Sequence, residues 1–242
     1  MSKTNGKVLD AYPMRINKYL ANEKGIATRR GADELIANGH VLINGHIALL
    51  GEKIQKGDHV ELIGKTVKKN YLYYAYHKPV GIITHSPQAG EKDIKGSVHL
   101  PKDVFPIGRL DKDSSGLLIL TNDGRVTDRL LNPKYTHDKE YRVRTLDPLR
   151  DSFKKTMESG VNIEGYLTKR CSVRVTGPNT FTITLVEGKK HQIRRMVAAL
   201  HNTVVELKRV RILNVRLDDL TLGMWRLIEG EELAIFLSSI GL

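Results

Sequence analysis

The sequence predicts an α+β protein in which a small helix-and-strand unit precedes a larger domain built around a mixed or antiparallel sheet. Three observations predict this fold class. The chain has 242 residues and is 40% hydrophobic, which is enough for a buried core and excludes disorder as its main state. Helical spacing followed by hairpin signals fills residues 14–63. Beyond residue 70, apolar runs of strand length outnumber helical patterns and are often joined by turns.

The first folded segment begins with two short amphipathic helices. Apolar residues recur at helical spacing from Ile16 to Leu20, and Gly25 is typical of a helix C-terminus. Thr28 predicts the N-cap of a second helix, because its hydroxyl can accept a hydrogen bond from a free backbone N–H of the first turn. Asn38 and the glycine after it predict the end of that helix.

A hairpin follows the two helices. Asn44-Gly45 separates two apolar runs, and both residues tolerate the positive φ angles of a tight hairpin turn. A last short strand is expected at residues 59–63. Residues 1–13 have the composition of a flexible tail and residues 64–70 that of a linker, so the segment 14–63 predicts a small domain of its own.

The larger domain, residues 71–242, alternates strands and helices. Strand patterns lie at 71–76, 117–121, 140–145, 171–175, 181–186 and 204–212. Helix patterns lie at 125–131, 149–158, 189–200 and 231–239.

Charge indicates the class of partner. Lys and Arg outnumber Asp and Glu by 39 to 27, and the sequence pI is near 9.7, which favours a polyanion such as nucleic acid as the partner.

The longest uncharged stretch, residues 35–51, is interrupted by polar side chains, so no membrane-spanning helix is expected. Residues 1–13 lack the apolar segment of a secretory signal. The single cysteine, Cys171, excludes an internal disulfide and a thiolate zinc site. We therefore expect a cytoplasmic protein.

Residues 108–124 join a polar loop to a buried strand. Asp111 and Asp113, with two serines and two glycines, precede the apolar residues 117–121. Ordinary turn chemistry is the alternative to a reactive loop here. A calcium loop is not expected, because Asn122 occupies the position that needs a bidentate glutamate.

The predicted helix at 189–200 begins with an unusual concentration of basic residues, namely Lys189, Lys190, His191, Arg194 and Arg195. Cations at a helix N-terminus oppose the helix dipole. A ligand phosphate, or a carboxylate from elsewhere in the fold, would offset them, and a solvated basic face is the alternative.

These segments resemble known RNA-associated families. Residues 14–63 resemble the α-L RNA-binding domain of ribosomal small-subunit protein four, through Arg15-Ile16-Asn17-Lys18-Tyr19-Leu20, the Thr-Arg-Arg step at 28–30 and the hairpin glycines. Gly31 departs from the family, which usually has glutamate there, and its low helix propensity predicts a softer second helix.

The larger domain resembles RNA pseudouridine synthases of the ribosomal RNA branch, the RsuA family. The matching motifs are Gly-Arg-Leu-Asp at 108–111, Ser-Gly-Leu-Leu-x-Leu-Thr-Asn-Asp-Gly at 115–124, Lys-x-Tyr-x-Val at 139–143 and Gln-Ile-Arg-Arg-Met at 192–196. Lesser matches lie at 77–81, 105–108 and 222–226. Residues 166–173 and 206–212 look nearest to the RluF-type enzymes.

The resemblance implies an isomerase that breaks the uridine N1–C1′ bond and rejoins the base through C5 without a cofactor or metal. It implies that Asp111 is the nucleophile, adding to C6 or assisting at C1′. Arg194 is then the basic partner that keeps this carboxylate charged, in a bidentate pair. Tyr141 would stack on the flipped base and move a proton, with a plain core tyrosine as the alternative.

The same resemblance suggests RNA contacts. Ile193 is expected to pack against the base or back the site, and Arg109 to contact phosphate or pair with Asp113. The further candidates for phosphate contacts are Lys189, Lys190, Arg195, Arg15, Lys18, Arg29 and Arg30.

The expected partner is ribosomal RNA, of the large subunit rather than the small, with transfer RNA as a further substrate of a monomeric enzyme. A non-catalytic RNA-binding ribosome-assembly factor fits the charge equally well, and a metal-dependent nuclease using Asp111 and Asp113 is a second rival. The joint presence of Asp111, Tyr141 and Arg194 favours the enzyme.

Overall fold

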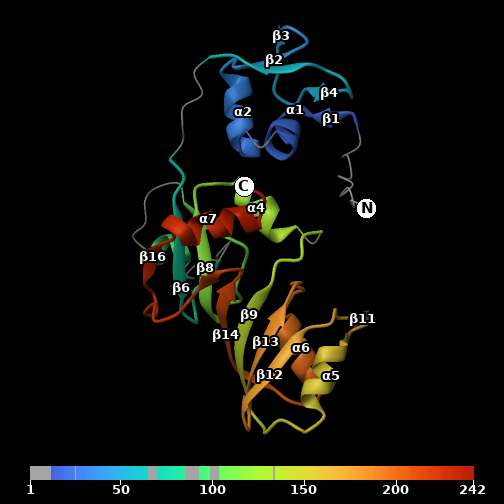
Figure 1. The fold of residues 1–242 in the computed structure, drawn as a ribbon, viewed down its shortest axis with the longest axis vertical. Helices are drawn as coiled ribbons and strands as arrows, with labels where there is room; N and C mark the ends of the chain where they lie inside the picture. The colour runs from blue at the N-terminus through green and yellow to red at the C-terminus, as the bar shows by residue number, and fades with distance from the viewer. Residues whose placement is uncertain (1–11, 25, 65–69, 85–92, 99–103, 133) are drawn as a thin grey trace. The chain divides into compact units, whose positions relative to one another are not determined.

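We describe the fold from a computed structural model, in which residues 12–24, 26–64, 70–84, 93–98, 104–132 and 134–242 are placed well enough to describe. The chain divides into two compact units, residues 1–70 and 71–242 (Figure 1). The predicted tail and linker, and Gly25, lie largely or wholly outside the described residues. The α+β class is confirmed, with a small N-terminal domain and a large mixed sheet.

The first unit packs short helices against two small sheets. Its elements are β1 (Met14–Arg15), α1 (Ile16–Lys18), the π-helix η1 (Tyr19–Glu23), α2 (Arg29–Ala37), β2 (Val41–Ile43), β3 (His46–Ile47), β4 (Lys53–Ile54) and β5 (Val60–Leu62). Strand β1 pairs with β4, and β2 lies between β3 and β5. The first predicted helix is one turn of α-helix continued by a π-helix, while the second is confirmed.

Local sequence explains these elements. The Thr28 hydroxyl accepts a hydrogen bond from the Gly31 N–H at 2.9 Å, which is the predicted N-cap of α2. Asn44 and Gly45 both have positive φ, as the hairpin between β2 and β3 requires. The core of this unit is formed by the apolar faces of the helices and strands, chiefly Met14, Ile16, Leu20, Ala32, Ile36, Val41, Ile43 and Ile54.

The second unit is built on one large sheet whose main path is β12-β13-β9-β14-β8-β6-β16. Only β14 and β8 run parallel, and every other pair is antiparallel. The strands on this path are β6 (Tyr73–Lys78), β8 (Ser115–Thr121), β9 (Lys139–Thr145), β12 (Ser172–Gly177), β13 (Thr180–Leu185), β14 (Val204–Ile212) and β16 (Trp225–Leu227). Two further strands, β7 (Phe105–Ile107) and β15 (Val215–Arg216), pair with β8 and β14.

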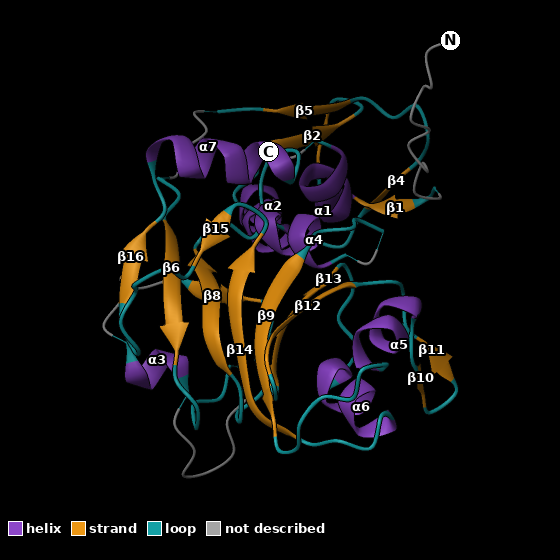
Figure 2. Cartoon of the chain, turned by 60° about the horizontal axis from the view of Figure 1, so that its bottom comes forward, coloured by secondary structure: helices purple, strands orange, loops and turns teal. Residues whose placement is uncertain are grey.

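Helices cover different parts of this sheet. They are α3 (Ile94–Ser97), α4 (Arg125–Leu131), α5 (Phe153–Ser159), α6 (Gln192–Ala199) and α7 (Gly230–Ser239). Helices α5 and α6, with the hairpin β10 (Asn162–Ile163) and β11 (Tyr166–Leu167), lie together at the β12 end of the sheet (Figure 2). Helices α4 and α7 contribute to a separate core over β6 and β8. The domain therefore has one large sheet, with the small β10-β11 sheet beside it, and two larger cores.

The sequence pattern predicts most of these elements. The bounds of β14 and α4 agree with the prediction, whereas α5 begins at Phe153 instead of residue 149. The short elements α3, β7, β10, β11, β15 and β16 were not predicted, because two to four residues carry too little periodicity. No described helix is both long enough and apolar enough to cross a lipid bilayer.

Candidate active site

Asp111 lies on a tight loop between β7 and β8. A glycine is required just beyond this loop, because β8 and β14 approach closely where Gly116 faces Arg209. A Cβ atom on Gly116 would collide with the backbone nitrogen and oxygen of Arg209, and its φ of 116° is rarely adopted by other residues. The Ser-Gly step of the motif therefore fixes where the strand begins and where the loop ends.

The loop itself, residues 109–114, is held through its backbone, and we call it the Asp111 loop. Each of its six consecutive carbonyl oxygens accepts a hydrogen bond. The donors, in chain order of the carbonyls, are Arg209 Nη1, Thr84 Oγ1, Ser114 N, Gly81 N, Arg194 Nη2 and Lys78 Nζ. Five of the six distances are 2.8–3.0 Å, and that from Arg209 is 3.5 Å. The bonds to Leu110 and Ser114 are buried, and the six together hold the loop in one conformation.

Three of these donors are cations. Lys78 is fully buried at the end of β6, and its ammonium donates to the carbonyls of Ser114 at 2.8 Å and Pro79 at 2.9 Å. Burial lowers the pKa of Lys78 to about 8, against the opposing effect of the Asp111 and Asp113 carboxylates. Arg209, also buried, donates from Nε to the Leu117 carbonyl at 2.8 Å and so joins β14 to β8 a second time.

The third cation, Arg194, corrects one expectation from the sequence. The Arg194 guanidinium does not form the expected bidentate pair with the Asp111 carboxylate. The guanidinium donates instead to the carbonyls of Asp113 at 2.8 Å and Val204 at 3.1 Å, and lies 3.4 Å from Ser114 Oγ. The guanidinium thus satisfies two backbone carbonyls, while the Asp111 carboxylate, which is 38% exposed, stays in contact with water.

The Asp111 side chain is consequently accessible. It is 38% exposed, and the one ion-pair distance recorded for it is 3.8 Å, from Oδ1 to Nε2 of His191. His191 lies immediately before α6 with a left-handed backbone, φ 52°. The sequence prediction missed this histidine as a partner of Asp111; its position in the basic run before Gln192 was the available signal. A carboxylate on a rigid loop, half open to solvent and beside an imidazole, can act as a nucleophile or a base.

Tyr141 lies on the same side of the sheet as this site. It pairs across strands with Arg209, which in turn faces Gly116, so Tyr141 is two strand spacings, about 10 Å, from the start of β8. Its ring is partly buried against the core under α5 and α6. Ile193 is only 4% exposed and belongs to that core.

The other predicted RNA contacts fall into two groups. Arg109, Lys189 and Lys190 are exposed, and no ion pair joins Arg109 to Asp113. The Lys189 ammonium lies 4.5 Å from the centre of the Tyr166 ring. Arg195 is engaged, because it forms an ion pair with Glu164 at 2.6 Å and donates to the Ile163 carbonyl.

In the first unit, Arg29 and Arg30 form the exposed first turn of α2. Arg15 is also exposed, immediately before α1, and Lys18 is half-buried at the end of that helix. These four positions therefore present cations beside the two helical segments.

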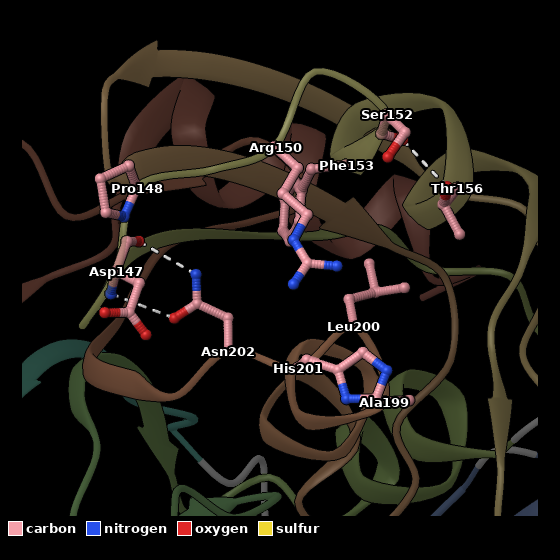
Figure 3. Close-up of a pocket in the computed structure, with 10 residues that line it drawn as sticks. All are labelled: Asp147, Pro148, Arg150, Ser152, Phe153, Thr156, Ala199, Leu200, His201 and Asn202. Carbon is pink, nitrogen blue, oxygen red and sulfur yellow. Dashed lines mark hydrogen bonds between the residues drawn. The ribbon is translucent and has the colours of Figure 1, made fainter.

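A cavity of about 320 Å³ lies elsewhere, at the far end of α6 from His191 (Figure 3). Two hydrogen bonds between the Asp147 backbone and the Asn202 amide form part of its wall. No residue of the Asp111 loop lines it, so it is separate from the site. Within the described part of the chain, no three His, Cys, Asp or Glu side chains are placed to hold a metal ion.

Comparison with known proteins gives this geometry a context. Residues 72–199 match the family model described as RNA pseudouridylate synthase, and residues 14–60 match the S4 domain. The dual-specificity RNA pseudouridine synthase RluF of Escherichia coli (strain K12) is 41% identical over 224 residues, covering 91% of this chain and 77% of that protein.

Two further similarities extend over most of the chain. The ribosomal large subunit pseudouridine synthase B of Bacillus subtilis (strain 168) is 34% identical, over 81% of this chain and 84% of its own length. A crystal structure of a pseudouridylate synthase superposes with a TM-score of 0.68 at 30% identity, and covers 91% of this chain and 98% of that one. The sequence similarity and the fold therefore agree.

Proposed function

Because this chain belongs to the RsuA family of RNA pseudouridine synthases, and carries that family's S4 domain, we propose that it isomerises a specific uridine of large-subunit ribosomal RNA to pseudouridine. Asp111 is the nucleophile in this proposal. The observation that carries it is the Asp111 loop: six backbone carbonyls are fixed by donors while the carboxylate between them stays accessible. A reactive group held in one position lowers the entropic part of a barrier.

The reaction exchanges one bond for another on the same nucleoside. The N1–C1′ bond breaks, the uracil turns, a C5–C1′ bond forms, and C5 loses a proton while N1 gains one. The Asp111 carboxylate can add to C6 of the base or assist departure at C1′, and its exposure suits both routes. The target nucleotide must first leave its stack to reach the carboxylate, which costs least in a loop or single strand.

Neighbouring side chains serve this step. The Tyr141 ring offers a stacking surface on the same face of the sheet, and its hydroxyl can carry a proton to or from carbon. Lys78, Arg194 and Arg209 hold the loop through its backbone. Arg194 therefore aims Asp111 by fixing the loop, and does not pair with its carboxylate.

RNA binding is distributed over both units in this proposal. Arg109, Lys189 and Lys190 lie exposed around the site, and Arg15, Lys18, Arg29 and Arg30 serve the S4 domain as phosphate contacts. Two relatives support these substrates, since one is named as a ribosomal large subunit enzyme and the other as a dual-specificity RNA enzyme. We accordingly propose a transfer RNA as second substrate, for an enzyme that acts as a cytoplasmic monomer, without cofactor or metal.

The test is tritium release from C5 of uridine-labelled ribosomal and transfer RNA. We expect Asp111→Ala to lose at least about 10⁴-fold in rate, as for other nucleophile deletions, with RNA affinity retained. Asp113→Ala is the matched control, because it removes an exposed carboxylate of the same loop, two residues after Asp111. This variant should retain most of the activity. Mapping the product then identifies the uridine.

Two results would overturn the proposal. Release by Asp111→Ala at the wild-type rate would remove Asp111 as nucleophile. Binding without release, by the wild-type chain on every ribosomal and transfer RNA, would make the protein an RNA-binding assembly factor.

A further inference from the structure

Among the described residues, no helix packs against one face of the sheet at its β12 end. On β9, Tyr141 and Val143 point into the core under α5 and α6, so Arg142 and Arg144 between and beyond them point to the opposite face. The same alternation puts Arg174 of β12 and Lys208 of β14 on that opposite face, since Val173 and Leu207 lie in the core. This face is therefore the reverse side of the strands that carry the candidate site.

Three cations on this face lie in one cross-strand row. Arg174 pairs with Thr182, Thr182 with Arg142, and Arg142 with Lys208. We call this set the cation row. Its three cations span three strand spacings, about 14 Å, perpendicular to the strands.

The rows on either side differ from it in their charge pairing. On one side, Arg144 pairs across strands with Glu206 and forms an ion pair with it at 3.3 Å. On the other, Arg211 forms ion pairs with Glu140 at 3.0 Å and with Asp138 at 2.7 Å. Each neighbouring row thus neutralises its cation within the protein.

The cation row contains no acid. Among the described residues, the side chains of Arg174, Arg142 and Lys208 form no ion pair or hydrogen bond. Moreover, Arg142 and Lys208 stand directly opposite each other on adjacent strands, and like charges in that position destabilise a sheet. An anion from outside the protein would relieve this repulsion.

We infer that the cation row binds the phosphate backbone of the RNA substrate, outside the segment that enters the active site. This inference rests on the proposed function for the identity of the polyanion. A row of about 14 Å is long enough to contact more than one phosphate of an RNA backbone. An acidic protein partner is the less favoured occupant, because the row offers no aromatic or large apolar side chain as an anchor.

The position of the row predicts which RNAs use it. Since Tyr141 and Arg142 are neighbours on β9 but point to opposite faces, one short hairpin bound at Asp111 does not reach the row. A long transcript reaches both faces. The row therefore contributes to affinity for long RNA and leaves the chemistry at Asp111 unchanged.

The test compares two RNAs over a range of KCl concentrations: a full-length large-subunit ribosomal RNA transcript, and a short hairpin around the mapped uridine. For Arg142→Gln/Arg174→Gln/Lys208→Gln, we expect at least about tenfold weaker binding of the transcript. The slope of log affinity against log salt should fall by about 2. Turnover of the hairpin should stay within twofold of wild type.

Two matched variants control for net charge and for folding. Arg150→Gln/Lys154→Gln/Lys155→Gln removes three exposed cations from the α5 side and should keep the salt slope. Arg142→Lys/Arg174→Lys keeps the charge of the row and should restore binding. The thermal unfolding midpoints of all variants should match that of the wild type if the sheet is intact.

The outcomes separate this inference from the proposed function. An unchanged salt slope in the Gln variant, or an equal loss on hairpin and transcript, overturns the cation row while pseudouridine formation stands. A reduced slope in a chain that forms no pseudouridine supports the row and overturns the enzyme. An acidic protein on this face would leave the RNA slope unchanged, and so counts against the inference.

Discussion

Two sets of three cations lie on opposite faces of the same sheet, and they differ in what they contact. Lys78, Arg194 and Arg209 donate to backbone carbonyls of the Asp111 loop and are buried or half-buried. The set in the cation row contacts no acid or carbonyl of the described chain. Cations of the first set supply donors to the loop carbonyls, which have no backbone partner in a strand or helix. In the second set, Arg142 and Arg174 are exposed and Lys208 is half-buried. A basic residue in an RNA enzyme is thus not by itself evidence for an RNA contact.

Among variants that remove a cation of either set, we expect the largest effect from Lys78→Met. The substitution leaves the carbonyls of Ser114 and Pro79 without a donor in a buried place, which costs about 1–3 kcal/mol of unfolding free energy. Because the loop then shifts, the single-turnover rate should fall by about 10²-fold. Denaturant unfolding and tritium release measure the two effects. A variant of wild-type stability and rate would show that Lys78 does not hold the loop.

Arg194→Met should produce a similar loss of rate, about 10²-fold, with a smaller loss of RNA affinity. Arg194→Lys is the informative control, since one ammonium cannot reach the carbonyls of both Asp113 and Val204 as the guanidinium does. Partial activity in the lysine variant is expected. Full activity in both variants would instead show that Arg194 does not position the Asp111 loop.

Adjacent residues of β9 offer a sharper form of the comparison. Tyr141→Phe keeps the ring and removes the hydroxyl, so we expect a loss of about 10²-fold in rate if the hydroxyl carries a proton. Arg142→Gln, one position along the strand, should leave hairpin turnover unchanged because it faces away. Equal activity of Tyr141→Phe and wild type would leave the tyrosine with a stacking role alone.

The dependence of turnover on pH tests the buried cation Lys78 without a substitution. Burial lowers the pKa of Lys78 to about 8, so turnover should decline above that pH as the ammonium loses its proton. The stability trend has the opposite sign: an unfolded lysine holds its proton more tightly, so the unfolding free energy rises between pH 8 and the ordinary lysine pKa. The profile of Lys78→Met should lack the alkaline decline. An identical decline in that variant would assign it to another group.

The smallest expected effect is on the stability of the cation-row variant. Exposed substitutions away from caps and networks change unfolding free energy by about 0.5 kcal/mol or less. Removing the repulsion between Arg142 and Lys208 should make the change neutral or slightly stabilising. Urea unfolding of the Gln variant measures it, and a loss above about 2 kcal/mol would mean that the row belongs to the fold.

Sequence reasoning predicted the parts of this protein that depend on local pattern. The helix at 125–131, the strand at 204–212 and the Thr28 cap agree with the structure, because periodicity and capping act over a few residues. The partner of Arg194 did not follow from the sequence. A motif indicates that Arg194 and Asp111 belong to one site, but whether a guanidinium meets a carboxylate or a carbonyl depends on the loop conformation.

The role of Arg209 was equally hidden. It depends on the register that puts Arg209 beside Gly116, a pairing between segments far apart in the chain. The cation row also exists only through register, since Arg174, Arg142 and Lys208 come from three separate strands. Long-range strand pairing is the information that a single sequence states least clearly.

The hydrogen bonds of the Asp111 loop also couple reactivity to the completion of folding. Its donors come from β6 and the residues after it, from α6 and from β14, which are among the first and last elements of the domain to be synthesised. Contacts between such distant segments form late, since closing long stretches of chain is entropically costly. An incompletely folded molecule can present its Asp111, but lacks the framework that aims the carboxylate. Only the finished domain can then modify RNA.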